Sequence, residues 1–316
     1  MLRVTFLGTA AARPTVGRNV SSVAVDREGE LMLFDCGEGT QRQMMRYGTG
    51  FTVGDIFFTH VHADHILGLT GLLLTMALQG REQQIRLWGP PGSTQTINDA
   101  VRLGMERLPF AATVRELRPD ERVTRDEYDI VAYRTKHGTH AIGYALIEHE
   151  RLGRFDLERA KALGVPAGPM YGRLHRGEDV VVDGRVVRAI EVVGPPRPGR
   201  KLVYTGDTRP CAATVNIGRE ADLLIHDATF ATDESERAQA TGHSTAREAA
   251  DVARRACAER LVLTHISARY ADDARVLERE ARRVFAKSLV AYDGLELEIG
   301  FRDAADEVPT ALQAES

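Results

Sequence analysis

The sequence predicts an α/β protein in which helices cover the faces of β-sheets. Short runs rich in β-branched and aromatic residues alternate with segments of helical periodicity in both halves of the chain. Elements that alternate in this way pack as layers, with the helices outside the sheets. At 316 residues, with 43% hydrophobic and 27% charged residues, the chain has the composition of a folded globular protein.

The first half of the chain begins with β-rich runs and continues as alternating strands and helices. Gly, Pro and Asn separate the first three runs, which indicates turns between consecutive strands. The elements predicted from apolar periodicity are strands over 3–8, 22–26, 31–35, 55–59 and 85–89, helices over 65–79 and 92–107, and further strands up to about residue 148.

The second half repeats this alternation. Thr245 and Glu248 have the spacing of a capping box, which marks the start of one helix. Residues 303–316 are polar and acidic without apolar periodicity, so we predict a disordered tail after a main domain over 1–302. The elements predicted here are strands over 201–205, 222–225 and 260–264, helices over 245–258 and 272–285, and two closing strands.

One segment interrupts the pattern between the two halves. Residues 148–201 contain a Gly- and Pro-rich run from Leu163 to Gly172, and we interpret the segment as an inserted arm, ordered but irregular. The arm carries eleven Lys or Arg and eight Asp or Glu, a net charge of plus three, whereas the whole chain has a net charge of minus four. Positive charge is therefore concentrated in the arm.

Four predicted strands lead directly into a side chain that can bind a metal ion. These side chains are His60, His137, Asp207 and His265. Strand ends converge where a sheet can present ligands to one crevice, so we expect the four side chains to lie together.

The run His60-Val61-His62-Ala63-Asp64-His65 extends this pattern within one loop. The first two histidines point the same way from an extended segment, and Asp64 and His65 stand at the turn into the next helix. We therefore predict two metal ions per chain that share one carboxylate. The predicted ligands are His60, His62, His137 and Asp207 for the first ion, and Asp64, His65, His265 and the same Asp207 for the second.

The chemistry of these side chains favours zinc. Imidazole nitrogens and carboxylate oxygens without thiolates suit zinc, with manganese and iron as open alternatives. Two zinc ions roughly 3.5 to 4 Å apart stabilise both the attacking and the leaving oxygen of an in-line displacement. One His-x-His pair alone would be weak support, but a set of seven ligands at strand ends is improbable for scattered histidines.

Further runs carry a family resemblance. They are Phe6-Leu7-Gly8-Thr9, Arg18-Asn19-Val20-Ser21-Ser22, Phe34-Asp35-Cys36-Gly37-Glu38-Gly39-Thr40-Gln41, Lys136-His137-Gly138, Tyr204-Thr205-Gly206-Asp207-Thr208 and His243-Ser244-Thr245. Together with the histidine run they resemble the metallo-β-lactamase superfamily and, within it, the ribonuclease Z family, which removes 3′ trailers from precursor tRNA. The resemblance implies an αββα sandwich, two sheets flanked by helices, and a zinc phosphodiesterase that leaves a 3′-hydroxyl on the tRNA and a 5′-phosphate on the trailer.

The resemblance also implies roles for single residues. Asp64 would be the proton acceptor as well as a zinc ligand, and His243 would either contact the reacting phosphate or protonate the leaving 3′ oxygen. Asp227, where the family usually has Glu, would pair with His243. Val16 stands where the family commonly has Lys, in an early loop that senses the tRNA 3′ end. For His226, a catalytic role and a polar strand end stay open.

The arm resembles the tRNA-gripping arm of bacterial ribonuclease Z, chiefly over Pro166 to Gly172. In that family the arm of one subunit holds a tRNA cleaved by the other, so the resemblance implies a homodimer. Basic side chains that neutralise phosphates contribute affinity without reading sequence. The residues predicted to contact precursor tRNA are Arg18, Arg151, Arg154, Arg159, Lys161, Arg173 and Arg176.

Two other functions remain open at this point. The first is hydrolysis of small esters or phosphodiesters by the same kind of metal site, which would not need a basic arm. The second is tRNA binding without catalysis, with zinc in a structural role. A complete ligand set with room for water argues against the second alternative.

Cysteine usage and the first residues predict a cytoplasmic location. The three cysteines are odd in number, widely spaced and without a Cys-x-x-Cys pair, which argues against a disulfide framework. The chain runs from Met1 straight into a strand, without the pattern of a signal peptide, and its most apolar stretch is short for a membrane span.

Overall fold

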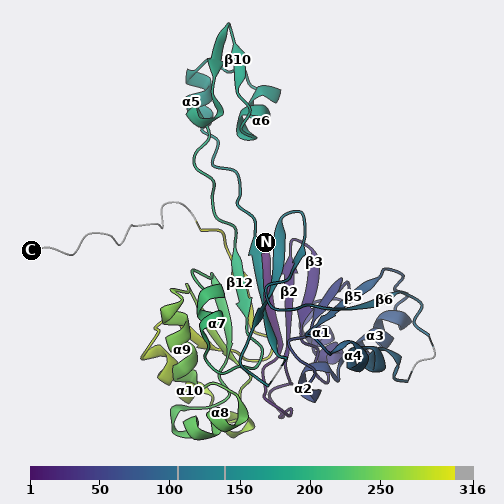
Figure 1. Cartoon of the computed structure of the whole chain (residues 1–316). Helices are drawn as coiled ribbons and strands as arrows, with labels where there is room; N and C mark the ends of the chain where they lie inside the picture. Colours follow the sequence, from purple (N-terminus) through teal and green to yellow (C-terminus); the bar gives the residue numbers. More distant parts are fainter. Residues whose placement is uncertain (105–106, 139, 303–316) are drawn as a thin grey trace, which may run out of the picture. The chain divides into compact units, whose positions relative to one another are not determined.

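The computed structural model describes residues 1–104, 107–138 and 140–302 (Figure 1). The described residues divide into two compact units, a larger one formed by 1–147 with 201–300 and a smaller one formed by 148–200 with 301–302. The tail predicted over 303–316 lies outside the described residues. Among the described residues no helix is long and apolar enough to cross a membrane.

The first sheet of the larger unit has seven strands in the order β16-β1-β2-β3-β4-β5-β6. Strands β16, β1, β2 and β3 pair antiparallel, and β3 to β6 pair parallel. Their bounds are β1 Leu2–Gly8, β2 Ser22–Arg27, β3 Glu30–Phe34, β4 Asp55–Phe57, β5 Ile85–Gly89, β6 Ala112–Glu116 and β16 Glu296–Ile299.

The second sheet also has seven strands, in the order β15-β14-β13-β12-β9-β8-β7. Strands β12 to β15 pair parallel, whereas β12 pairs antiparallel with β9 and β7 pairs antiparallel with β8. Their bounds are β7 Arg122–Thr124, β8 Tyr128–Arg134, β9 Ile142–Glu148, β12 Lys201–Tyr204, β13 Leu223–Asp227, β14 Leu261–Thr264 and β15 Ser288–Val290.

Helices cover the outer face of each sheet of the larger unit (Figure 1). The helices before residue 148 are α1 Thr40–Tyr47, α2 Ala63–Ile66, α3 Leu69–Leu78 and α4 Thr94–Arg102. Those after residue 201 are α7 Ala212–Ile217, α8 Ser235–Thr241, α9 Ala246–Arg255 and α10 Arg275–Arg282, with 3-10 turns η2 Thr232–Glu234 and η3 Ala268–Tyr270.

The core between the two sheets is apolar and partly aromatic. The Phe57 and Tyr144 rings, one from each sheet, lie 5.2 Å apart between centroids, and Phe34 packs against Tyr204 at 5.8 Å. Such pairs add to the stabilisation that comes from buried apolar area. Two sheets packed face to face with helices outside confirm the predicted αββα class.

The helix predicted over 65–79 is two helices, α2 and α3, separated at Gly68. A Cβ atom at Gly68 would stand 1.9 Å from the carbonyl oxygen of Gly37, so only glycine permits this approach of the two backbones. The interruption restricts α2 to a single turn, and that turn carries Asp64 and His65.

The smaller unit is more regular than the sequence analysis expected. It contains the helices α5 Leu157–Ala162 and α6 Pro169–His175, the hairpin β10 Val180–Val182 with β11 Arg185–Val187, and the 3-10 turn η1 Ala189–Glu191. Ala160, Leu174 and Val187 are fully buried in a small core of its own. The description of the arm as irregular was therefore wrong, because the Gly and Pro of its sequence bound short helices.

Candidate metal centre

The structure brings the four strand-end side chains together. His60 follows β4 of the first sheet, while His137, Asp207 and His265 follow β8, β12 and β14 of the second. The rings of His60 and His137 lie 5.1 Å apart, and Asp207 Oδ1 lies 3.3 Å from His265 Nε2. One end of the two-sheet core therefore collects side chains that are spread over the sequence from residue 60 to residue 265.

The turn between His60 and His65 supplies the remaining predicted ligands. His62 is extended (φ −67°, ψ 154°) and immediately precedes α2, whose first residues include Asp64 and His65. Two groups result in which all ligand atoms lie within 4.8 Å of one another. They are His60, His62, His137 and Asp207, and Asp64, His65 and His265.

Asp207 presents one carboxylate oxygen to each group. Its Oδ2 lies 3.5 Å from His60 Nε2 and 3.9 Å from His137 Nε2, whereas its Oδ1 lies 3.3 Å from the Nε2 atoms of both His65 and His265. This is the arrangement expected of a carboxylate shared between two cations. Gly206 places Asp207 there, because its φ of +58° and the Thr59 side chain only 2.6 Å from a Cβ position both exclude larger residues.

Four of the histidines are oriented by hydrogen bonds on their Nδ1 atoms. The contacts are His60 with Thr59 Oγ1 (3.0 Å), His65 with Asp35 Oδ2 (2.8 Å), His137 with the Gly242 carbonyl oxygen (3.0 Å) and His265 with Thr229 Oγ1 (2.8 Å). Both threonine hydroxyls donate to carboxylates, so they accept from the histidines. In a neutral ring, a proton on Nδ1 leaves a free lone pair on Nε2. Hydrogen bonds on Nδ1 therefore prepare the Nε2 atom of the imidazole to bind a metal ion.

The donor set fits a metal ion. His60 Nε2, His65 Nε2 and Asp207 Oδ1 are buried and have no hydrogen-bond partner among the described residues. Burying such an atom unsatisfied costs about 1–3 kcal/mol, so three in one place suit the ligands of a cation better than a packing feature. Burial opposes ionisation of Asp207, but the rings of His265 and His65 hold its pKa well below the usual range.

Asp64 is kept ionised at the edge of the site. Burial raises its pKa, but its contacts with His265 and His65 outweigh burial and lower it overall. The backbone N–H of Ala12 also donates to Asp64 Oδ2 over 2.8 Å. An ionised, oriented carboxylate of this kind can accept a proton from water.

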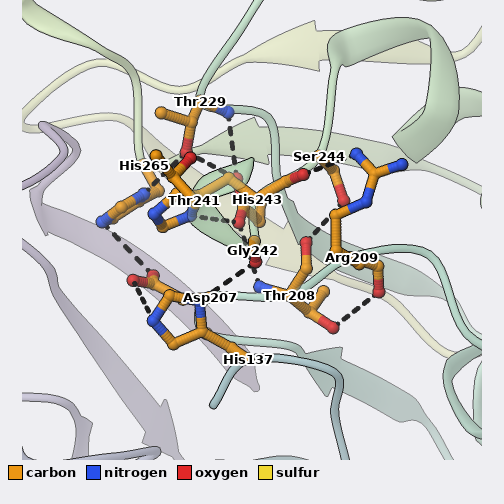
Figure 2. Close-up of polar contacts among 12 residues, drawn as sticks. His137, Asp207, Thr208, Arg209, Thr229, Thr241, Gly242, His243, Ser244 and His265 are labelled. Carbon is orange, nitrogen blue, oxygen red and sulfur yellow. Dashed lines mark hydrogen bonds and ion pairs between the residues drawn. The ribbon is translucent and has the colours of Figure 1, made fainter. Parts of the chain in front are cut away.

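His243, labelled in Figure 2, lies beside the clusters and pairs with Asp227. His243 Nδ1 donates to Asp227 Oδ2 over 2.9 Å. The Asp227 carboxylate therefore reaches His243, although its side chain is one methylene shorter than the usual Glu. Thr229 Oγ1 and the Thr208 N–H also donate to the Asp227 carboxylate. Burial lowers the pKa of His243, but Asp227 raises it to about 9 overall. His226 is buried, its Nε2 has no hydrogen-bond partner among the described residues, and it belongs to none of the groups that could hold a metal ion there.

Arg18 is used internally. Its Nη1 donates to Thr9 Oγ1 (2.7 Å) and to the Ala291 carbonyl oxygen (2.6 Å), and Asp293 accepts from Thr9 and from the Asn19 N–H. These bonds anchor the early loop that brings Ala12 to Asp64. The guanidinium therefore holds this loop in place, and contact of Arg18 with tRNA stays a prediction. Val16, in the same loop, is fully exposed.

Two clefts flank the clusters. A cleft of about 600 Å³ is lined by His243 and His265 together with Arg13, Arg237 and Arg269, and a cleft of about 410 Å³ adjoins the His60 group. The first cleft therefore combines three positive side chains with His243. A larger hollow of about 840 Å³ elsewhere on the unit contains none of the predicted site residues.

The predicted arm residues all lie in the smaller unit. Five of them are exposed, while Arg151 is half-buried with its guanidinium 3.4 Å from the Phe301 ring centroid. Several pair with acidic neighbours of the same unit, such as Arg173 with Glu178 over 3.0 Å and Lys161 with Glu158 over 2.7 Å. Exposed pairs of this kind are weak and exchange readily for other anions.

Comparison with known proteins decides the family. Residues 2–153 match a family model described as anti-Pycsar protein Apyc1, and residues 183–266 match a beta-lactamase superfamily domain. Ribonuclease Z of Gemmatimonas aurantiaca is 54% identical over 312 residues, 98% of this chain and 99% of the relative. Ribonuclease Z of Haloferax volcanii is 54% identical over 306 residues, 96% of each chain. The chain belongs to the ribonuclease Z family.

Solved structures agree with this membership in ribonuclease Z. The short form of human tRNase Z superposes with a TM-score of 0.69 at 30% identity, covering 95% of this chain and 100% of that one. The metallo-beta-lactamase fold protein YhfI from Bacillus subtilis also gives a TM-score of 0.69, but its 19% identity supports the fold alone. The predicted family and fold are thus confirmed.

Several residues of the candidate site escaped the sequence analysis. Asp35 directly follows β3, as Asp207 closely follows β12, and its carboxylate accepts from His65, from Thr59 and from the Tyr204 hydroxyl. Its position after an apolar strand was therefore a usable signal. Thr229 and the Ala12 N–H carried no such signal, because a single hydroxyl or backbone group has no distinctive sequence pattern.

Proposed function

We propose that this chain is a two-zinc phosphodiesterase that cuts precursor tRNA after the discriminator nucleotide and releases the 3′ trailer. The observation that carries the proposal is Asp207, which offers one oxygen to each of two histidine groups in a member of the ribonuclease Z family. Small-ester hydrolysis is less favoured, because a cleft with three arginines beside His243 suits a polyanion.

The proposed ligand sets follow the two groups. His60, His62, His137 and Asp207 would hold one ion, and Asp64, His65, His265 with the same Asp207 the other. Nitrogen and carboxylate donors without thiolate suit zinc. Zinc bound there would stabilise negative charge on the phosphate and lower the pKa of a water molecule.

The side chains of the protein then divide the proton transfers. Asp64, ionised and held by Ala12, accepts a proton from the attacking water. The water oxygen bonds to phosphorus as the bond from phosphorus to the 3′ oxygen breaks. His243, protonated at neutral pH and oriented by Asp227, gives its proton to that leaving oxygen. The tRNA keeps a 3′-hydroxyl and the trailer carries the 5′-phosphate.

We further propose that the smaller unit grips the tRNA. Its exposed basic side chains suit phosphates spread over a folded RNA. Lys161 and Arg173 form weak, exposed ion pairs with acidic neighbours, and a phosphate group can replace these neighbours. The arm would serve a homodimer, in which one subunit holds the tRNA that the other cuts. Sedimentation of the protein with and without tRNA tests the dimer, and a monomer cleaving at full rate would exclude it. Three free cysteines favour a reducing compartment such as the cytoplasm.

The decisive assay uses precursor tRNA with a 3′ trailer and zinc. Wild-type protein should cut once, after the discriminator, and Asp64→Ala should lose at least about a thousandfold in rate, because the proton acceptor and a ligand go together. Asp99→Ala is the matched control, since Asp99 is exposed on α4 and bonds only to Gln95 among the contacts of the described residues. No cleavage by wild type, or equal cleavage by wild type and Asp64→Ala, would overturn the proposal.

A further inference from the structure

Arg209 lies two residues after Asp207 and makes contacts that the proposed chemistry has not used (Figure 2). Its Nη1 donates to the His243 carbonyl oxygen over 2.7 Å. The same guanidinium forms a two-point ion pair with Glu248, with Nη1 2.8 Å from Oε2 and Nη2 2.5 Å from Oε1. The arginine side chain is only 18% exposed, so water competes little for these bonds.

Arg209 also joins the loops that carry three site residues. Its backbone N–H donates to the carbonyl oxygen of Lys136, the residue before His137. The Ser244 hydroxyl donates to the Thr208 carbonyl oxygen over 2.6 Å, which ties the same two loops again beside His243. The loops after β8 and β12 and the loop before α9 therefore meet around Arg209, through its backbone and its side chain.

We propose that Arg209 is a positioning residue for His243. Glu248 fixes the guanidinium, and the guanidinium fixes the His243 backbone, so that the imidazole stays on Asp227 and faces the leaving oxygen. This inference rests on the proposed function, in which His243 supplies the proton. A displacement of about 1 Å at a catalytic group can cost about a hundredfold in rate, which sets the scale of the effect.

The geometry separates this role from a merely structural one. Glu248 already closes a capping box with Thr245, whose N–H donates to Glu248 Oε2 over 2.9 Å and whose hydroxyl accepts from the Glu248 N–H over 3.2 Å. The start of α9 is therefore held without Arg209. Only the planar, forked guanidinium can hold Glu248 at two points and the His243 carbonyl at once, which a lysine ammonium cannot do.

The test compares two substrates that differ in their need for a proton donor. Cleavage of precursor tRNA releases a 3′ alkoxide that must be protonated. Cleavage of bis(p-nitrophenyl) phosphate instead releases a stable phenolate. Arg209→Met should lower kcat on precursor tRNA about tenfold to a hundredfold, change KM and zinc content little, and leave the phosphate ester within about twofold. Arg209→Lys should recover only part of the loss. Arg254→Met, which removes an exposed pair with Asp251 on the same helix, is the control.

Two further measurements complete the test. In a His243→Ala background, Arg209→Met should cause no additional loss on precursor tRNA, whereas an additional loss of the same size would overturn the inference. A crystal structure of Arg209→Met should show His243 displaced from Asp227. An unchanged contact of about 2.9 Å there would also overturn it.

Failure of the inference and failure of the proposed function give different results. If wild type and Arg209→Met cut precursor tRNA alike while His243→Ala is impaired, the positioning role is wrong and the function stands. If wild type does not cut precursor tRNA, the function is wrong, and the crystal structure of the variant still decides whether Arg209 holds His243. If Arg209→Met does not fold, Arg209→Lys takes its place in each comparison.

Discussion

The metal centre of the larger unit and the basic face of the smaller unit use charge in opposite ways. His65 and His265 are 0% and 3% exposed, and each has one defined partner on Nδ1. Arg173 and Arg176 in the smaller unit have side chains 49% and 62% exposed and share one acidic neighbour.

This contrast predicts that the two regions differ in how strongly a single substitution lowers activity. A buried ligand is placed by its backbone and cannot be replaced by a neighbour, so one substitution should remove most of the activity. Exposed basic residues contribute through their sum, so the loss of one should be small. The predictions below test this contrast from the largest expected effect to the smallest.

Asp207→Asn should be the most damaging single change. It keeps the shape of the side chain but removes the charge that two cations share, which costs several kcal/mol of transition-state stabilisation, or about a thousandfold or more in kcat. Zinc content, measured by plasma mass spectrometry, should fall with the activity. Asp99→Asn serves as the control, and normal activity of Asp207→Asn would contradict the shared-carboxylate arrangement.

Removal of the whole arm should separate substrate binding from chemistry. Ile147 and Lys201 are directly opposite in the β9–β12 pair, so a short Gly/Ser linker can replace 149–199 without breaking the sheet. Precursor tRNA cleavage should fall about a hundredfold in kcat/KM, because many phosphate contacts are lost together. Hydrolysis of bis(p-nitrophenyl) phosphate should stay within about twofold. Equal loss on both substrates would show that the arm supports the metal centre itself.

Asp227→Asn should change the pH dependence of the reaction. Asp227 raises the pKa of His243 to about 9. In wild type, His243 therefore stays protonated below that pH, and the rate of cleavage declines as the pH rises through it. Without the carboxylate the pKa should fall toward the ordinary value of about 6.5. We expect kcat to fall about tenfold at neutral pH and its alkaline decline to begin at lower pH. An unshifted decline in a full pH–rate profile would assign that limb to another group.

Arg173→Ala should have the smallest effect. The side chain is exposed and paired with Glu178, and it is one of several cations on the unit. Cleavage of precursor tRNA should drop less than about threefold, and the dependence of binding on salt should become shallower by about one ion. A loss of cleavage activity as large as that of the arm deletion would mean that Arg173 makes a specific contact with the tRNA. It would contradict a role in which Arg173 contributes only to the total charge.

The fold and the clustering of the candidate ligands were predictable because they depend on local patterns. An apolar strand followed by His or Asp is visible in the sequence, and strand ends meet at one edge. Asp35 could have been found by the same pattern. The distance from Asp227 to His243 could not, because it is set by how β13 and the loop before α9 pack rather than by side-chain length.

Two features were hidden in the sequence for a common physical reason. The internal hydrogen bonds of Arg18 could not be predicted, because its donors satisfy Thr9 and a carbonyl that the chain places there only after folding. The helices of the arm were hidden because short helices depend on packing, here of Ala160 and Leu174, more than on their own periodicity. Tertiary contacts decided both outcomes.

The most direct test of the account is a zinc titration of chelated, metal-free protein during cleavage of precursor tRNA. The arrangement around Asp207 predicts that activity rises to a plateau at two equivalents of zinc per chain, with a single cut after the discriminator. Full activity without metal, or a plateau at one equivalent, would contradict it.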